Sequence, residues 1–471
     1  MLPMMAKRKS WIESLLDRRS FLRLAGAGLI ASGMRAAARP PNIVIILCDD
    51  LGYGDIGCFG SSIRTPNLDR MAGEGVRFTH FCSANPVCSP SRAALLTGRY
   101  PTRVGVPRVL FPTDNTGLPD SETTLAQMLK TRHYRTLCVG KWHLGRPPRF
   151  LPTNRGFDEY FGIPYSNDMN PRVLLHNTDV VEQEATLDTL TPRYTELAVR
   201  FVEQSSSAPF FLYMPHTYPH IPLGASPRFR GHSPQGLYGD VVRELDWSVG
   251  EVLAALKRTG VDNDTLVLFT SDNGPWFQGS PGRLRGRKGM TWEGGVREPF
   301  LARWPGHIPP GKVCTGLASM MDILPTVAAL AGAARPDNAL DGIDIWPMLS
   351  GRKNELDRDV LLYFDDENVQ CARLGNWKLH FSRYNNATWS PPPAGGRKNI
   401  TLAKPELYDL ANDPDESYDV AAEHPDVVAK MQGRVAALIP GFPEEVRRAW
   451  TDTLSRQSGE TRSGALPVLS K

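Results

Sequence analysis

Four short apolar runs, each followed by polar residues, constrain the fold of this chain more than any other feature. They occupy residues 42–47, 136–139, 210–214 and 265–270. Continuous runs of β-branched and other apolar residues are typical of parallel strands that are covered on both faces. Segments that we expect to be helical lie between or beside them, at 67–74, 124–132, 191–205 and 237–259. This alternation predicts an α/β fold with a large, mostly parallel central sheet flanked by helices.

The polar residues that follow these runs are candidates for a functional site, because the carboxyl ends of parallel strands converge on one crevice. The runs end, in chain order, at Asp49-Asp50, Lys141-Trp142-His143, Pro215-His216 and Asp272-Asn273. Aspartate and asparagine offer only oxygen ligands, which suit a hard divalent cation better than zinc. Turn capping is the alternative for either acidic pair alone. The two pairs together with Cys88 favour a metal site.

Residues 85–99 indicate a loop that enters a helix. Pro86 and Pro90 predict that this helix begins after Cys88, with Ser89 or Ser91 as its cap and Gly98 as its end. A thiol just ahead of a helix N-terminus, with Arg92 four residues further on, is predicted to be reactive. A buried structural cysteine is the alternative.

These residues also carry a resemblance to a known family. Cys88-Ser89-Pro90-Ser91-Arg92, followed by Thr97-Gly98-Arg99, resembles the Cys-x-Pro-x-Arg signature of the type I, formylglycine-dependent sulfatases, in particular the arylsulfatase-like members of the alkaline phosphatase superfamily. Residues 140–145 resemble the family's Gly-Lys-Trp-His segment. Residues 288–297 resemble its lysine followed by Trp-Glu-Gly-Gly-Val-Arg, and the resemblance covers about residues 40–440.

The resemblance implies a sulfuric ester hydrolase that cleaves sulfate monoesters of a carbohydrate or an aryl alcohol. Cys88 would be oxidised to Cα-formylglycine (3-oxoalanine) by a formylglycine-generating enzyme, and the hydrated aldehyde would be the nucleophile. The implied cation is Ca²⁺, with Mg²⁺ as the alternative. Its implied ligands are Asp49, Asp50, Cys88, Asp272 and Asn273.

The remaining roles are also implied by the resemblance. Lys141, Lys288 and His216 would bind the sulfate, and His216 or Lys288 would protonate the leaving alcohol. His143 would take the proton from the remaining hydroxyl of the hydrate, and Arg92 would orient the hydrate. The other implied substrate-binding residues are His220, as the rival of His216, and Ser166.

Two other functions remain open. One is a phosphodiesterase or phosphonate monoester hydrolase on the same scaffold, because sulfate and phosphate esters share tetrahedral geometry. The other is a non-catalytic glycan-binding relative in which Cys88 stays a thiol. The expected partner is a sulfated small molecule or saccharide. A formal charge of +4 on 471 residues is too small to predict binding to nucleic acid or stable insertion into a membrane.

The length of the chain predicts more than one domain. We expect a signal segment at 1–38, a catalytic domain at 39–355, a small antiparallel α+β domain at 356–451 and a disordered tail at 452–471. Residues 17–24 resemble the twin-arginine export motif and predict a periplasmic or extracellular protein, an ordinary amphipathic helix being the alternative.

The seven cysteines include no CxxC pair and no zinc spacing. We expect Cys48 and Cys138 to be buried in strands, whereas pairing of Cys58 with Cys82 stays open. Substrate specificity is expected to reside in loops such as 107–118 and 384–400, which carry no motif.

Overall fold

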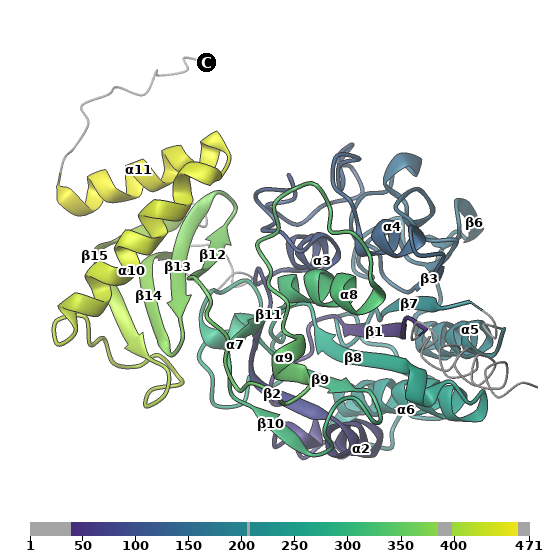
Figure 1. Ribbon diagram of the computed structural model, residues 1–471. Coiled ribbons are helices and arrows are strands. Elements are labelled where there is room, and N and C mark those ends of the chain that lie inside the picture. Colours follow the sequence, from purple (N-terminus) through teal and green to yellow (C-terminus); the bar gives the residue numbers. More distant parts are fainter. Residues whose placement is uncertain (1–38, 205–207, 385–397, 460–471) are drawn as a thin grey trace, which may run out of the picture. The chain divides into compact units, whose positions relative to one another are not determined.

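The computed structural model describes residues 39–204, 208–384 and 398–459 (Figure 1). The proposed signal segment 1–38 therefore lies outside the described residues. From Pro41 onward the chain belongs to one unit. Its described part contains an eleven-stranded sheet and a separate four-stranded sheet.

The large sheet is centred on β1 (Asn42–Cys48), which lies parallel between β7 (Phe210–Pro215) and β8 (Thr265–Ser271). β3 (Arg135–Val139) runs parallel to β7 and to β4 (Glu159–Gly162). The other strands are β2 (Val76–Cys82), β5 (Leu174–His176), β6 (Asp179–Glu182), β9 (Arg297–Arg303), β10 (Lys312–Cys314) and β11 (Ala318–Ser319). β9 is antiparallel to both β8 and β2. At the edge of the sheet formed by β6, β5 is antiparallel to both β4 and β6. The predicted α/β sheet is confirmed, with parallel strands at its centre.

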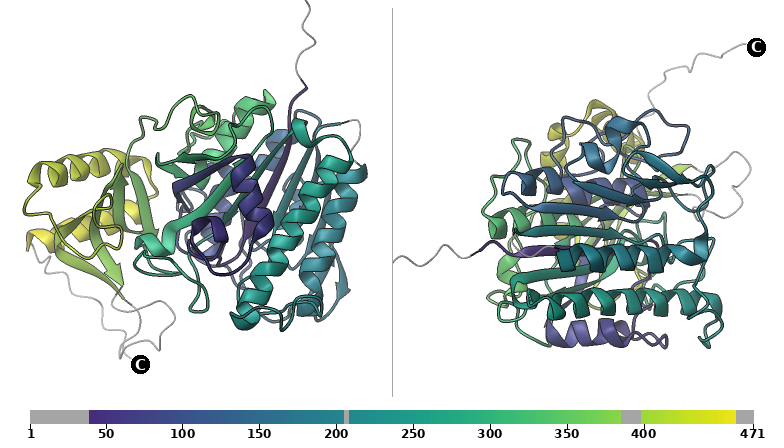
Figure 2. Two further views of the ribbon diagram at one scale, coloured as in Figure 1. Left: turned by 90° about the horizontal axis from the view of Figure 1, so that it is seen from below. Right: turned by 90° about the vertical axis from the view of Figure 1, so that its right-hand side faces the viewer.

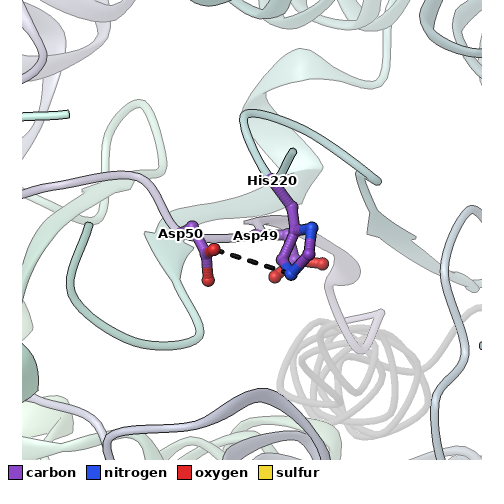
Figure 3. A group of neighbouring side chains, drawn as sticks. All are labelled: Asp49, Asp50 and His220. Atoms are coloured by element: carbon purple, nitrogen blue, oxygen red, sulfur yellow. Dashed lines mark ion pairs between the residues drawn. The ribbon is translucent and has the colours of Figure 1, made fainter. Parts of the chain in front are cut away.

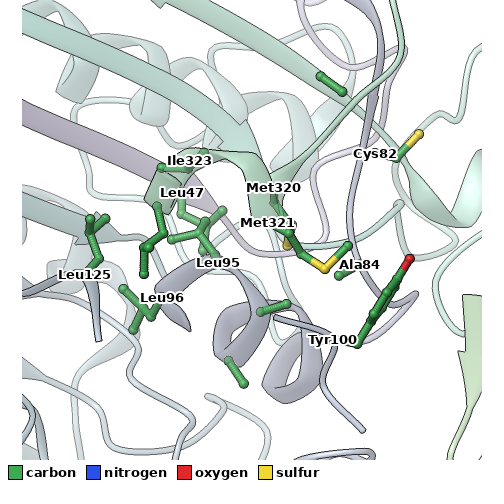
Figure 4. Packing of buried hydrophobic residues seen from close by; sticks show 14 of the residues in the cluster. Leu47, Cys82, Ala84, Leu95, Leu96, Tyr100, Leu125, Met320, Met321 and Ile323 are labelled. Carbon is green, nitrogen blue, oxygen red and sulfur yellow. The ribbon is translucent and has the colours of Figure 1, made fainter. Parts of the chain in front are cut away.

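Helices cover both faces of this sheet (Figures 1 and 2). Side chains of β1 alternate between two apolar cores, as a strand requires: Ile43 and Ile45 enter one core, Val44 and Ile46 the other. The first core contains residues of α3 (Cys88–Thr97), α4 (Leu125–Lys130) and α8 (Ile323–Ala331), and Figure 4 shows part of it. The second core contains residues of α2 (Pro66–Glu74), α5 (Leu190–Gln204) and α6 (Gly236–Arg258). Two short helices, α7 (Glu293–Val296) and α9 (Trp346–Leu349), complete this part.

The helix after the cysteine differs from the prediction in its start. Cys88 is the first residue of α3, and Val87 is an N-cap without a side-chain hydrogen bond. Pro90 lies in the first turn, where a missing N–H group leaves no helical hydrogen bond unmade, so the proline does not exclude Cys88 from the helix. Gly98 ends the helix in the left-handed conformation, with φ of 69°, as predicted.

Neither candidate serine caps this helix. The Ser91 hydroxyl donates to the Asn85 carbonyl oxygen at 2.6 Å, and the Ser89 hydroxyl accepts from the Leu110 N–H at 3.1 Å. Both serines therefore tie the helix to loops before and after it.

The small sheet follows the prediction of an antiparallel α+β region. It consists of β12 (Leu361–Asp365), β13 (Asn368–Leu374), β14 (Trp377–Tyr384) and β15 (Asn399–Asp409). Helices α10 (Pro425–Leu438) and α11 (Glu444–Ser458) pack on it, with the Trp450 ring 4.9 Å from that of Phe381. α11 ends at Ser458, so the ordered chain extends beyond the start of the tail predicted at 452. Residues 460–471 lie outside the described residues.

A buried ionic cluster joins the two sheets. Glu293 of α7 is 2.7 Å from the Arg373 guanidinium on β13 and 3.0 Å from the Lys378 ammonium on β14. Lys378 is also 3.2 Å from Glu416, and all four side chains are fully buried. Burial alone would raise the pKa of Glu293, but the charges of Arg373 and Lys378 hold it well below its usual range.

All seven cysteines are free thiols. Cys48 and Cys138 are buried, as predicted, and Cys58 does not pair with Cys82. Within the described ranges, no helix is both long and apolar enough to cross a membrane.

The ionic cluster predicts a large effect of one substitution. Glu293→Gln should lower the free energy of unfolding by about 3–5 kcal/mol, because it removes the counter-charge shared by three buried or nearly buried cations, Arg297, Arg373 and Lys378. Urea denaturation followed by tryptophan fluorescence measures this loss. Glu196→Gln, which removes a carboxylate from an exposed pair with Arg200, is the matched control and should leave the midpoint unchanged. Equal midpoints for the two variants would contradict the role assigned to the cluster.

Candidate active site

Four oxygen-bearing side chains meet where β1 and β8 end. The two strands are parallel neighbours with Cys48 opposite Ser271, so the Asp49-Asp50 pair and the Asp272-Asn273 pair lie side by side. The Asp50 N–H donates to Asp272 Oδ1 at 3.3 Å, and Asn273 Nδ2 donates to Asp50 Oδ1 at 2.8 Å. All four residues are buried. The structure thus brings together the oxygen set that the strand endings predict.

Two groups in this cluster have the spacing of metal ligands. Ligand atoms of Asp49, Cys88 and Asp272 lie within 4.8 Å of one another, and so do those of Asp49, Asp50 and His220 (Figure 3). Asp49 Oδ1 and Asn273 Oδ1 are buried and have no hydrogen-bond partner among the described residues. Buried carboxylate and amide oxygens without donors are the ligands that a hard divalent cation takes. The residues present therefore fit such an ion.

Arg92 is part of the same buried cluster. Its Nε donates to Asp272 Oδ2 at 2.9 Å, and its Nη2 lies 2.8 Å from that oxygen and 3.4 Å from Asp49 Oδ2. Its Nη1 donates to the Lys141 carbonyl oxygen at 2.6 Å. Arg92 therefore holds the ends of β1, β8 and β3 together.

The two predicted lysines also meet here. Lys141 Nζ binds the Asp49 carboxylate and donates to Ser166 Oγ at 3.0 Å, and Lys288 Nζ lies 2.7 Å from Asp50 Oδ1. Burial by itself would raise the pKa of Asp49, but the charge of Lys141 holds it well below its usual range. Burial raises the pKa of Asp50 to about 6, and Lys288 opposes this rise. The two adjacent carboxyls thus have different proton affinities.

His220, and not His216, is the histidine of this cluster. His220 Nε2 is 3.5 Å from Ser166 Oγ and 3.7 Å from Asp50 Oδ2. The His216 ring instead faces Ser248 of α6 at 3.5 Å, and its backbone N–H still pairs with the Leu47 carbonyl oxygen. His216 therefore continues β7 on the face that packs against α6. This is a correction to the preference for His216.

His143 adopts an unusual backbone conformation. Its φ is 61°, and Asp50 has a φ of 66°, so two non-glycine residues of the site are left-handed. His143 Nε2 lies 2.9 Å from the Leu110 carbonyl oxygen, which can only accept, so this nitrogen carries the proton. Burial lowers the pKa of His143 well below its ordinary value, which keeps the ring neutral.

Gly140 lets the end of β3 reach the site. Its φ is 136°, and an added Cβ would lie only 1.8 Å from the Pro215 carbonyl oxygen. Only glycine can occupy this close approach of β3 to β7.

These groups open into a cavity of about 640 Å³. Its polar lining includes Cys88, His143, Ser166, His220 and Lys288. Burial raises the pKa of Cys88 to about 11, so the free thiol is protonated at neutral pH. Sequence reasoning did not identify the residues that form the rest of the lining: Val109, Phe111, Pro112, Thr113, Asp168, Met169, Asn170, Ile221 and Trp276. Several belong to the loop 107–118, which the sequence predicts to affect specificity.

Comparison with known proteins identifies the family. The model of the sulfatase family matches residues 41–333, and that of the C-terminal region of aryl-sulfatase matches residues 356–444. The chain is 42% identical to human arylsulfatase A over 88% of this chain and 89% of that protein. It is 39% identical to pig (Sus scrofa) N-acetylgalactosamine-6-sulfatase, over 90% of each chain.

Solved structures agree with this relationship. The PsFucS1 sulfatase from Pseudoalteromonas sp. superposes with a TM-score of 0.78 at 29% identity, covering 89% of this chain and 94% of that one. A sulfatase from work on glycosaminoglycan metabolism by Bacteroides thetaiotaomicron gives 0.77 at 29% identity, covering 85% and 99%. The phosphonate monoester hydrolase of Agrobacterium radiobacter, at 21% identity and 0.59, shares the fold. The chain therefore belongs to the sulfatase family and is a sulfuric ester hydrolase with the fold of the alkaline phosphatase superfamily.

Proposed function

We propose that this protein hydrolyses sulfate monoesters with a formylglycine made from Cys88 and a bound divalent cation, Ca²⁺ in preference to Mg²⁺. The observation that carries the proposal is the position of Cys88, which lines the cavity and lies within ligand distance of Asp49 and Asp272. When present, formylglycine supplies a hydrated aldehyde as nucleophile, and the cation supplies positive charge next to the sulfate oxygens. Asp49, Asp50, Asp272, Asn273 and residue 88 would hold the cation.

The cationic side chains bind the sulfate in this proposal. Lys288 lines the cavity, and Lys141 donates a hydrogen bond to Ser166, which lines it as well. Charge on the non-bridging oxygens of a sulfate ester is stabilised by fixed cations in a site from which water is largely excluded. Arg92 acts on the site by fixing the Asp49 and Asp272 carboxylates.

The two cavity histidines handle protons. His143 holds its Nε2 proton against the Leu110 carbonyl oxygen, so its unpartnered Nδ1 is the nitrogen that can accept a proton. His220 directs Nδ1 to the Ile221 carbonyl oxygen and Nε2 toward Ser166 and Asp50. The Ile221 carbonyl oxygen can only accept, so the neutral His220 ring carries its proton on Nδ1, and Nε2 can donate only from the doubly protonated ring. We assign to this imidazolium, which the Asp50 carboxylate and the sulfate would both favour, the Nε2–H contact with the sulfate and the protonation of the leaving alcohol oxygen.

We also propose the division of the chain and its export. The family matches at 41–333 and 356–444 support a catalytic domain at 39–355 and a C-terminal domain at 356–451. The twin-arginine-like motif at 17–24 supports export of the folded protein, which requires that residue 88 is modified before translocation.

The first test is the modification itself. In protein produced together with a formylglycine-generating enzyme, the peptide that contains residue 88 should be lighter by about 18 Da than the thiol form. Cys88→Ala should abolish hydrolysis of an aryl sulfate and leave the circular dichroism spectrum unchanged, whereas Cys58→Ser should keep full activity. An unmodified Cys88 in a fully active enzyme would overturn the proposal, and so would faster hydrolysis of a phosphodiester than of the sulfate.

The second test separates the two histidines. His220→Ala should lower kcat/KM for an aryl sulfate by roughly 10²- to 10⁴-fold, because it removes a proton donor at the cavity. His216→Ala should lower the thermal midpoint, through the space left beside α6, more than it lowers kcat/KM. Steady-state kinetics and thermal unfolding of both variants measure the difference. A larger kinetic loss in the His216 variant would return the role to that residue.

The third test concerns the cation. Ca²⁺ should raise the thermal midpoint of the EDTA-treated protein, since an ion that binds only the folded state stabilises it by about 2.7 kcal/mol at a hundred times its Kd. Asn273→Ala removes an unpartnered ligand oxygen and should raise the Kd at least about tenfold, which corresponds to 1.4 kcal/mol. Asn412→Ala, an exposed asparagine, is the control. An unchanged Ca²⁺ affinity in the Asn273 variant would exclude this ligand set, and a greater shift with Mg²⁺ would reverse the preferred metal.

A further inference from the structure

The more exposed part of the cavity lining, its mouth, is largely apolar, whereas the buried part, its floor, is polar. Apolar side chains form much of the lining above Cys88 and Lys288: Val109, Phe111, Pro112, Met169, Ile221 and Trp276. Phe111 is 45% exposed, and the neighbouring Phe277 packs edge-to-face on Trp276 and is 54% exposed. Large apolar side chains exposed around a concave site indicate a ligand with an apolar surface. If the sulfate group of an ester binds among the polar residues at the floor, the apolar surface at the mouth contacts the alcohol part of that ester.

The walls of the mouth are fixed to the site residues. The Leu110 N–H donates to Ser89 Oγ at 3.1 Å, and the Leu110 carbonyl oxygen accepts from His143 at 2.9 Å. These two bonds place the adjacent Val109 and Phe111. On the other wall, Asn167 Nδ2 donates to the carbonyl oxygens of His220 at 3.2 Å and Pro222 at 2.9 Å. The second wall, which carries Asp168 and Met169, is therefore anchored as well.

The charges of the lining are arranged for one anionic group only. Lys288 is the only lysine or arginine among the described residues that line the cavity, and its ammonium group is bound to Asp50 at the floor. Asp168, by contrast, is an exposed carboxylate in the same lining. A second anionic group on the alcohol part would meet no lysine or arginine of this lining other than Lys288 and would be repelled by Asp168.

We infer that the cavity selects sulfate monoesters whose alcohol part carries an aromatic or other apolar face and no second negative charge, and that Asp168 is the residue that discriminates against anionic alcohols. This inference rests on the proposed sulfatase function and adds the substrate class to it. Phe111 supplies the apolar contact, and Asp168 supplies the repulsion.

The charge part is tested with two substrates, 4-nitrophenyl sulfate and the same ester with a carboxylate on the ring. Asp168→Asn should raise the ratio of kcat/KM for the carboxylated ester to that for the neutral ester by roughly three- to ten-fold, and 0.5 M NaCl should shrink this change. Asp179→Asn removes an exposed carboxylate on β6, outside the cavity, and should leave the ratio unchanged. The same ratio in the Asp168 variant and the wild type would overturn the inference.

The apolar part is tested with Phe111→Ala. This variant should lower kcat/KM for 4-nitrophenyl sulfate about five-fold or more relative to a short alkyl sulfate, since only the aromatic ester reaches the mouth. An unchanged preference for the aromatic ester would overturn this part. Failure of the proposed function gives a different result, because the wild-type enzyme would then hydrolyse none of these esters.

Discussion

Three carboxylates buried side by side are the constraint on which the rest of this structure depends. Asp49, Asp50 and Asp272 lie at the ends of two adjacent strands, where their mutual repulsion is strong and water cannot screen it. Arg92 and two lysines supply the opposing charge, and they come from α3, from the end of β3 and from the loop before α7. The elements that carry these cations must therefore be held accurately against β1 and β8. In this arrangement Asp49 Oδ1 and Asn273 Oδ1 accept no hydrogen bond from the described residues, so the cluster fits a cation.

The small C-terminal sheet contributes to this accuracy. Lys288, which binds Asp50, lies a few residues before Trp292 and Glu293 in the chain. Both of these residues contact the small sheet. The Trp292 ring contacts both the Arg285 guanidinium, at 3.9 Å, and the His380 ring of β14, at 4.4 Å. Glu293 ends in the ionic cluster with β13 and β14. The small sheet thus anchors the loop that carries Lys288 to Asp50 and the cavity.

The amino-acid sequence predicts the parts of the site that follow from strand geometry. Residues at the ends of parallel strands must converge, so the Asp49-Asp50 and Asp272-Asn273 pairs can be placed together from the pattern of apolar runs alone. The choice between His216 and His220 depends on side-chain direction instead. Met214 faces the core beneath α6, and a residue two positions later in a strand shares its face, so alternation assigns His216 to that core. The start of α3 differs from the prediction because the first turn of a helix tolerates a proline, which breaks a helix only further along.

The sequence indicates the loop 107–118 as a determinant of specificity but not which of its residues line the cavity, because the course of these loops is set by tertiary contacts. Hydrogen bonds at Leu110 and Asn167 bring Phe111 and Asp168 into the cavity lining, and neither residue belongs to a periodic pattern. Both bonds end on residues of the site, one on the His143 ring and the other on the His220 carbonyl oxygen. A change in either loop therefore alters the orientation of a histidine as well as the shape of the mouth. The loops that line the cavity and the two histidines therefore share the same hydrogen bonds, so a substitution that moves a loop also moves a histidine.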